Sequence, residues 1–146
     1  MAAEEFITAA ARELATRFGF KVFPVNGQKK PACKGGHKAA TDSDQKIQAL
    51  FKNCRHAEGV AIRTGRCSNI LVLDVDSKRT EDLGFDPLDK LIDQFGDDWT
   101  DTTRVFTPSG GHHFYFKLDS DDDIVFSSRV GIFDAKEAML LHRLAW

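Results

Sequence analysis

One short stretch, residues 70–78, constrains this chain more than any other part of it. Four consecutive aliphatic residues open the stretch, and Asp74, Val75 and Asp76 follow them. A continuous apolar run of this length predicts a strand that is buried on both faces. Because side chains alternate along a strand, Asp74 and Asp76 should share one face while Val75 points into the core.

Two carboxylates at the end of a buried strand suggest a cation site. Asp74 and Asp76 would repel each other if both were ionised. A divalent cation would relieve that repulsion, and carboxylate oxygens suit hard ions such as Mg²⁺ or Mn²⁺. The alternative is a strand end that runs into a solvated acidic loop, with Ser77 and Lys78 as turn residues. The stretch alone leaves both interpretations open.

The composition is that of an ordinary globular domain. The chain of 146 residues suffices for one domain with a core, and its formal net charge of -2 provides no overall basic field for nucleic acid. Three cysteines are too few for a disulfide framework, and neither a membrane-spanning run nor a signal peptide is visible. We therefore expect a reduced, cytoplasmic protein without membrane contact, in which any nucleic-acid binding depends on a local patch.

Periodicity predicts three helices. The first spans residues 3–18, the second starts with Asp42 as its N-cap, and the third starts at Asp86 and ends at Gly96. The apolar faces expected to be buried are Phe6, Ala10, Leu14 and Phe18 beside Ile7 in the first helix, Ile47, Leu50, Phe51 and Cys54 in the second, and Leu88, Leu91, Ile92 and Phe95 in the third.

Alternating or continuous apolar patterns predict strands between these helices. The expected strands span residues 20–25, 59–62, 69–75, 103–106 and 112–118. On the last strand His113 and Tyr115 should share one face, opposite Phe114 and Phe116. The order of elements predicts an α+β fold, a mixed β-sheet with flanking helices, with α/β as the alternative. We expect a single domain over residues 1–146, divided into an N-terminal helix-strand-helix unit (1–58) and a sheet (59–146).

The most basic segment is the loop at residues 29–38. Lysines and glycines commonly form an ordinary solvated loop. Glycines also expose backbone N–H groups and lysines supply positive charge, so the same composition suits a loop that faces phosphates.

Other chemistries fit the sequence less well. A zinc site could be assembled from Cys33, His37, Cys54, His56 and Cys67. Their spacings do not match the usual zinc motifs, which disfavours that site. Ser109 and His113 lack a nucleophile-elbow motif, and the chain contains no Walker-type phosphate loop.

Five segments, taken in order, resemble one known family. They are Gly19–Pro24, the Lys30-Pro31 pair with Gly36–Asp42, Gly59–Gly65, Leu71–Asp76, and Thr107–Phe116. In these segments the chain resembles the bifunctional DNA primase/polymerase N-terminal (PrimPol) domain of the archaeo-eukaryotic primase superfamily. Leu71–Asp76 resembles the family's DxD metal motif, and Thr107–Phe116 resembles its TPSGGxHxYF motif. The resemblance implies a primase-polymerase architecture with an RRM-like palm.

The resemblance also implies roles for individual residues. Asp74 and Asp76 would bind two divalent metals, Mg²⁺ or Mn²⁺, and His113 would contact the phosphates of the incoming (d)NTP. Asp134 would supply the third metal-binding carboxylate, completing a catalytic set with the other three. Residues implied in nucleotide binding are Lys29, Lys30, Arg63, Thr64, Ser109, Gly110, Gly111 and His113.

The implied activity is template-directed nucleotidyl transfer on a DNA template and primer, in phage or plasmid-type replication, with a replicative helicase as a candidate partner. The chain departs from the family at its end. The segment Val130–Asp134 carries one extra residue, and residues 137–146 do not resemble what should follow, so we expect a shortened C-terminal part. Two alternatives stay open: a catalytically inactive nucleotide- or DNA-binding relic or accessory module, and a domain whose acids hold only a structural cation.

Overall fold

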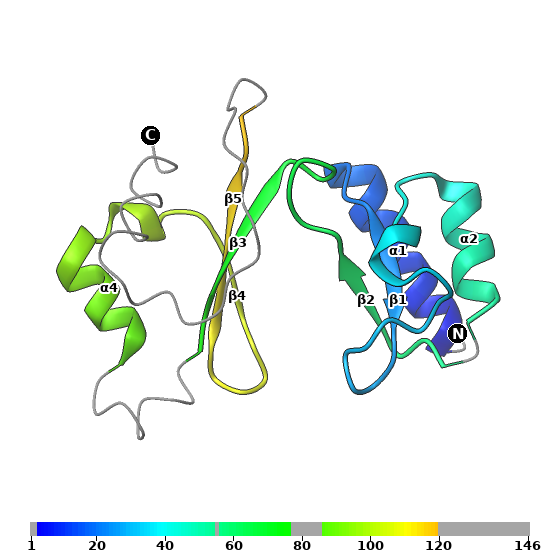
Figure 1. Ribbon diagram of the computed structural model, residues 1–146, viewed down its shortest axis with the longest axis horizontal. Coiled ribbons are helices and arrows are strands. Elements are labelled where there is room, and N and C mark those ends of the chain that lie inside the picture. The colour runs from blue at the N-terminus through cyan, green and yellow to red at the C-terminus, as the bar shows by residue number, and fades with distance from the viewer. Residues whose placement is uncertain (1–2, 55, 77–85, 120–146) are drawn as a thin grey trace. The chain divides into compact units, whose positions relative to one another are not determined.

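The computed structural model describes residues 3–54, 56–76 and 86–119. The chain divides into two compact units, unit 1 (Met1–Asn69) and unit 2 (Ile70–Trp146). Both units combine helices with small antiparallel sheets, which confirms the expected α+β class (Figure 1). No helix within the described ranges is long and apolar enough to cross a membrane.

Unit 1 is a two-stranded sheet packed against two helices. Its elements are α1 (Ala3–Phe18), β1 (Val22–Val25), the short 3-10 helix η1 (Gly36–Ala39), α2 (Asp44–Lys52) and β2 (Gly59–Ile62). Strands β1 and β2 pair antiparallel, and α1 and α2 pack against each other and against β1 (Figure 1). Strand β2 hydrogen-bonds to β1 and therefore belongs to unit 1. The boundary between the compact units lies at residues 69/70, whereas the subdivision expected from the sequence lies at 58/59.

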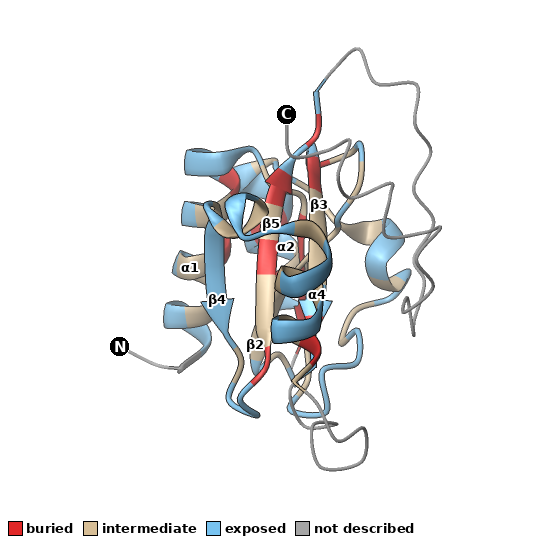
Figure 2. Ribbon diagram, turned by 90° about the vertical axis from the view of Figure 1, so that its left-hand side faces the viewer, coloured by how far each residue is buried: buried red, intermediate tan, exposed pale blue. Residues whose placement is uncertain are grey.

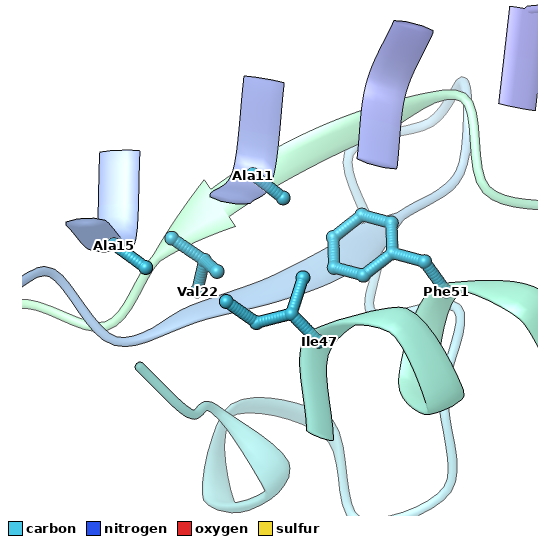
Figure 3. Close-up of a cluster of buried hydrophobic side chains, with 5 residues drawn as sticks. All are labelled: Ala11, Ala15, Val22, Ile47 and Phe51. Atoms are coloured by element: carbon cyan, nitrogen blue, oxygen red, sulfur yellow. The ribbon is translucent and has the colours of Figure 1, made fainter. Parts of the chain in front are cut away.

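The core of unit 1 lies where the two helices meet β1. Side chains from α1 (Ala11, Ala15), β1 (Val22) and α2 (Ile47, Phe51) converge there, as Figure 3 shows. The face predicted for α2 is confirmed in Ile47 and Phe51, which are buried.

The face predicted for α1 is wrong in its two phenylalanines. Phe6 is 67% exposed and Phe18 is 53% exposed, while Ala11 and Ala15 are buried. Small alanine side chains let the backbone of α1 approach β1 and α2 closely, so the Ala11–Ala15 row forms the contact. The N-cap of α2 is Ser43, one residue beyond the expected Asp42.

The described residues of unit 2 form a three-stranded sheet with one α-helix. Its elements are β3 (Ile70–Val75), α4 (Pro87–Phe95), the 3-10 helix η3 (Asp98–Thr100), β4 (Thr103–Phe106) and β5 (His112–Lys117). The strand order is β3-β5-β4, and both pairs are antiparallel (Figure 1). Helix α4 begins as predicted, because the Asp86 carboxylate accepts a hydrogen bond from the Leu88 N–H at 2.8 Å and Pro87 occupies the first turn.

The sheet of unit 2 has two different faces. Its α4 face contains the buried residues Val75, Phe114 and Phe116, against which α4 and η3 pack Leu88, Leu91 and Trp99. Its opposite face, named here the His113 face, contains Val72, Asp74, His113 and Tyr115. Strand β4 lies at an edge of this sheet, beside β5, and is pale blue along its whole length in Figure 2, since all four of its residues are exposed.

Candidate functional site

The candidate site is centred on Asp74 and His113, which lie directly opposite each other on β3 and β5. Residues opposite each other in an antiparallel pair share a face of the sheet. Nε2 of His113 lies 3.5 Å from Oδ1 of Asp74, and the two side chains are 34% and 67% exposed, respectively. The structure therefore places an accessible carboxylate and an accessible imidazole side by side on the His113 face.

Asp76 follows the end of β3 and continues its alternation. Asp74 is exposed, Val75 is 3% exposed and Asp76 is exposed again. This pattern confirms that Val75 belongs to the core and that the two acids point away from it. Both carboxylates thus lie at the same end of the strand, where their oxygens suit a hard divalent cation.

The turn between β4 and β5 is fixed by hydrogen bonds around Thr107. The Thr107 N–H donates to the Gly111 carbonyl at 2.9 Å, and the Gly110 N–H donates to the Thr107 carbonyl at 2.9 Å. The hydroxyl of Thr107 accepts from the Gly111 N–H at 2.9 Å and lies 3.0 Å from the hydroxyl of Ser109. Gly110 has φ +87°, a conformation that favours glycine.

Gly111 connects this turn to the acidic strand end. A Cβ atom at Gly111 would lie 2.8 Å from the carbonyl oxygen of Val75 and 3.5 Å from Cα of Asp76. Only glycine permits so close an approach of two backbones. The turn consequently packs against the end of β3, which Figure 1 shows beside the β4–β5 loop.

Tyr115 extends the site along β5. It lies on the same face as His113, and the two ring centroids are 6.5 Å apart. Burial raises the pKa of the Tyr115 hydroxyl above its usual value, so this group stays protonated and able to donate a hydrogen bond at neutral pH.

His112 lies on the α4 face, away from Asp74. Its Nδ1 accepts a hydrogen bond from Nε of Arg104 at 3.2 Å. Burial lowers the pKa of His112, Arg104 lowers it further, and Asp86 opposes the shift. The lowered pKa favours a neutral imidazole at His112 at neutral pH.

The remaining sequence-predicted residues lie outside this pair. Lys29, Lys30, Arg63 and Thr64 belong to unit 1, so their proximity to Asp74 remains a prediction. Asp134 lies outside the described residues.

One residue that sequence analysis missed is Asn26. Its carboxamide oxygen accepts hydrogen bonds from the N–H groups of Gln28 and Lys30, each at 3.0 Å, and so shapes the turn that carries Lys29 and Lys30. The Asn26-Gly27 dipeptide, a frequent turn signal, could have revealed it.

In the part of the chain that the structure describes, no group of three or more His, Cys, Asp or Glu side chains converges to form a possible metal site. Cys54 is buried, and its pKa is raised by that burial first and by the neighbouring Cys33 second. Among the described side chains, these two thiols have no third potential metal ligand beside them.

The His113 face therefore presents a carboxylate beside an imidazole, and α4 covers the opposite face of the same sheet. The chain belongs to the bifunctional DNA primase/polymerase N-terminal domain family, whose family model matches residues 11–135. This match confirms the resemblance inferred from the sequence. No curated protein and no solved structure shows significant similarity to the chain.

Proposed function

We propose that this domain catalyses template-directed nucleotidyl transfer from a (d)NTP to a DNA primer or starting nucleotide, in phage or plasmid-type replication. The observation that carries the proposal is the cross-strand pair of Asp74 and His113, with their side chains 3.5 Å apart on one face. Membership of the primase/polymerase family supplies the reaction class.

Asp74 and Asp76 are the groups that would hold divalent cations. Both are exposed at one end of β3, and their oxygens match the preferences of Mg²⁺ and Mn²⁺. Bound metal would supply electrostatic stabilisation of the attacking and leaving oxygens. The carboxylates would orient the nucleotide through the bound metal. Asp74 and Asp76 repel each other when both are ionised, and a cation between them would remove that repulsion.

His113 is the proposed phosphate contact. Its Nε2 faces the carboxylate of Asp74, so a phosphate group held near that acid lies within reach of the imidazole. An N–H donor aimed at a phosphate stabilises the charge that develops during transfer. Ser109, Gly110 and Gly111 form the neighbouring turn and complete the nucleotide-binding part of unit 2.

A second set of phosphate contacts is proposed in unit 1. Lys29 and Lys30 are exposed on the turn shaped by Asn26, and Arg63 with Thr64 follows β2. These groups would meet phosphates of the nucleotide or the template. A replicative helicase remains the proposed partner protein.

Asp134 is the proposed third metal ligand. Two cations in a phosphoryl-transfer site usually need more than two protein carboxylates, because each ion keeps several oxygen ligands. The described residues contribute Asp74 and Asp76, so further oxygen ligands must come from another carboxylate of the chain or from the phosphates of the nucleotide.

The second candidate function is an inactive nucleotide- or DNA-binding module. It is favoured by one observation: within the described ranges no three potential metal ligands converge. Such a module would bind nucleotide through His113 and the basic turn without completing the transfer.

Incorporation of a labelled nucleotide separates the two functions. The purified protein is incubated with Mg²⁺ or Mn²⁺, labelled dNTP or NTP, and either a primed or an unprimed template, with EDTA as control. Metal-dependent extension supports the enzyme. Metal-dependent nucleotide binding without extension supports the inactive module, and absence of both contradicts the proposed function.

A further inference from the structure

Phe106 is an aromatic side chain that projects from an edge strand into solvent. It ends β4 and is 68% exposed. Two neighbours nevertheless fix its ring. The guanidinium carbon of Arg104 lies 4.7 Å from the ring centroid, and the His112 ring meets it edge-on at 5.0 Å with an interplanar angle of 75°. The ring is thus presented in one orientation and does not fold back onto the core.

Arg104 is itself held firmly. Its guanidinium lies over Phe114, 5.1 Å from that centroid, in addition to Phe106, and its Nε donates to Nδ1 of His112. A planar cation between two rings is favoured by cation–π attraction. The result is a flat apolar surface joined to a fixed positive charge.

This combination matches one ligand chemistry better than others. A partner protein with an apolar surface would require a continuous aliphatic patch. The other exposed apolar residue of β4, Val105, lies on the opposite face of the sheet, and the face of Phe106 carries the charged Arg104. A single nucleic-acid strand offers flat bases for the ring and phosphates for the cation. Bases in a duplex are stacked on one another, so unpaired bases are the better fit.

The position of Phe106 connects it with the candidate site. Phe106 pairs with His112 on β5, and the next pair along the hairpin is Val105 with His113. Phe106 therefore lies one residue pair from the Asp74–His113 contact, on the α4 face of the same sheet end. Because β4 is the edge strand, a nucleic-acid strand could pass round that edge from one face to the other.

We propose that Phe106 and Arg104 form a stacking site for an unpaired base of a single-stranded nucleic acid. That this strand is the template rests on the proposed function, whereas the stacking itself does not.

Binding of two labelled strands tests the stacking site. Fluorescence anisotropy is measured in EDTA and low salt with a short oligothymidylate and with an abasic strand of equal length. Phe106→Ala should weaken oligothymidylate binding about thirtyfold, the middle of the range for loss of one stacked base, and should leave abasic-strand binding unchanged. Phe6→Ala is the matched control, because Phe6 is 67% exposed, and it should bind both strands as the wild type does.

Phe106→Trp provides a second, direct readout. The chain already contains Trp99 and Trp146, so the signal is the fluorescence of Phe106→Trp in excess of the wild type. This added indole fluorescence should be quenched by oligothymidylate and not by the abasic strand, which decides the matter even if Phe106→Ala folds poorly by thermal melting. The proposal is overturned if oligothymidylate does not quench the indole, if Phe106→Ala loses affinity equally for both strands, or if the wild type binds neither strand. In that last case a protein partner would be the occupant to seek.

The outcome is independent of nucleotide transfer. A protein that needs Phe106 for oligothymidylate binding but incorporates no nucleotide would keep the stacking site and refute the proposed function. If the protein incorporates nucleotide and Phe106→Ala binds oligothymidylate as the wild type does, the proposed function stands and the stacking site is refuted.

Discussion

His113 and Asp74 are direct cross-strand partners, with Nε2 of the histidine 3.5 Å from Oδ1 of the aspartate. Both side chains are partly exposed, so water screens their attraction and the pair contributes little to stability. Its importance is positional. The register of β3 against β5 is sufficient to bring the Asp74 carboxylate next to the His113 imidazole, and no loop residue is needed for this contact.

Removing either acid should abolish metal-dependent transfer and leave the fold intact. Asp74 and Asp76 are exposed, so Asp74→Ala and Asp76→Ala should each change the free energy of unfolding without metal by no more than about 0.5 kcal/mol. Thermal melting and labelled-nucleotide incorporation measure the two effects. Asp93→Ala, which removes an exposed carboxylate from α4, is the control and should retain transfer. A large loss of melting temperature in both acidic-pair variants would show that these acids are structural.

Gly111 should tolerate alanine less well than Gly110. At Gly111 the added methyl meets the Val75 carbonyl at 2.8 Å, and overpacking against backbone costs about 1–3 kcal/mol. At Gly110 the space is free but φ is +87°, and that conformation costs a residue with a Cβ about 1 kcal/mol. Gly110→Asn should cost less than Gly110→Ala, since asparagine tolerates positive φ better. Urea unfolding compares the variants, and equal stability of Gly111→Ala and wild type would refute the close contact.

The pKa of His112 should lie below the value of a free imidazole, about 6.5. Burial lowers it first, and Arg104 adds to the effect against Asp86. Because the unfolded chain then takes up the proton at a higher pH than the native state, this residue costs stability as pH falls below about 6.5. Arg104→Met should raise the pKa in an NMR titration without restoring it fully, since burial remains. A pKa above 6.5 in the wild type would contradict the arrangement.

The turn carrying Lys29 and Lys30 should contribute to a DNA affinity that is weak and steeply dependent on salt. The chain has a net charge of -2, so binding must come from local charge. Replacing either lysine by alanine should weaken binding to every sequence alike and reduce the slope of log affinity against log salt by about 1 per lost phosphate contact. Lys46→Ala on α2 is the matched control. Binding that is constant from low to high salt would exclude a phosphate-dominated contact.

Much of the fold could be predicted because its signals are local. Asp86, Pro87 and Gly96 delimit α4 through capping and backbone preferences that act within one turn. The buried face of α1 could not be predicted in the same way, because the choice between the Phe6–Phe18 row and the Ala11–Ala15 row depends on which neighbours pack there. Bulk hydrophobicity favoured the phenylalanines, whereas close helix packing selects the alanines.

The geometry of the candidate site was less predictable than the strands that carry its residues. Alternation along each strand predicted that Asp74 and Asp76 share a face and that His113 and Tyr115 share a face, but the pairing of Asp74 with His113 depends on long-range register. The contact of Gly111 with the end of β3 is likewise a tertiary feature with no local signal.

A double-mutant cycle on nucleotide binding tests most directly whether Asp74 and His113 serve one metal-dependent site. The affinity of a fluorescent dNTP is measured with Mn²⁺ and with EDTA for the wild type, Asp74→Asn, His113→Gln and the double variant. Each single change should weaken Mn²⁺-dependent binding about tenfold, as expected for loss of one charge-assisted contact, and the double variant should lose less than the product of the two. Wild-type affinity in both single variants, or losses that multiply fully as for independent sites, would contradict a shared site.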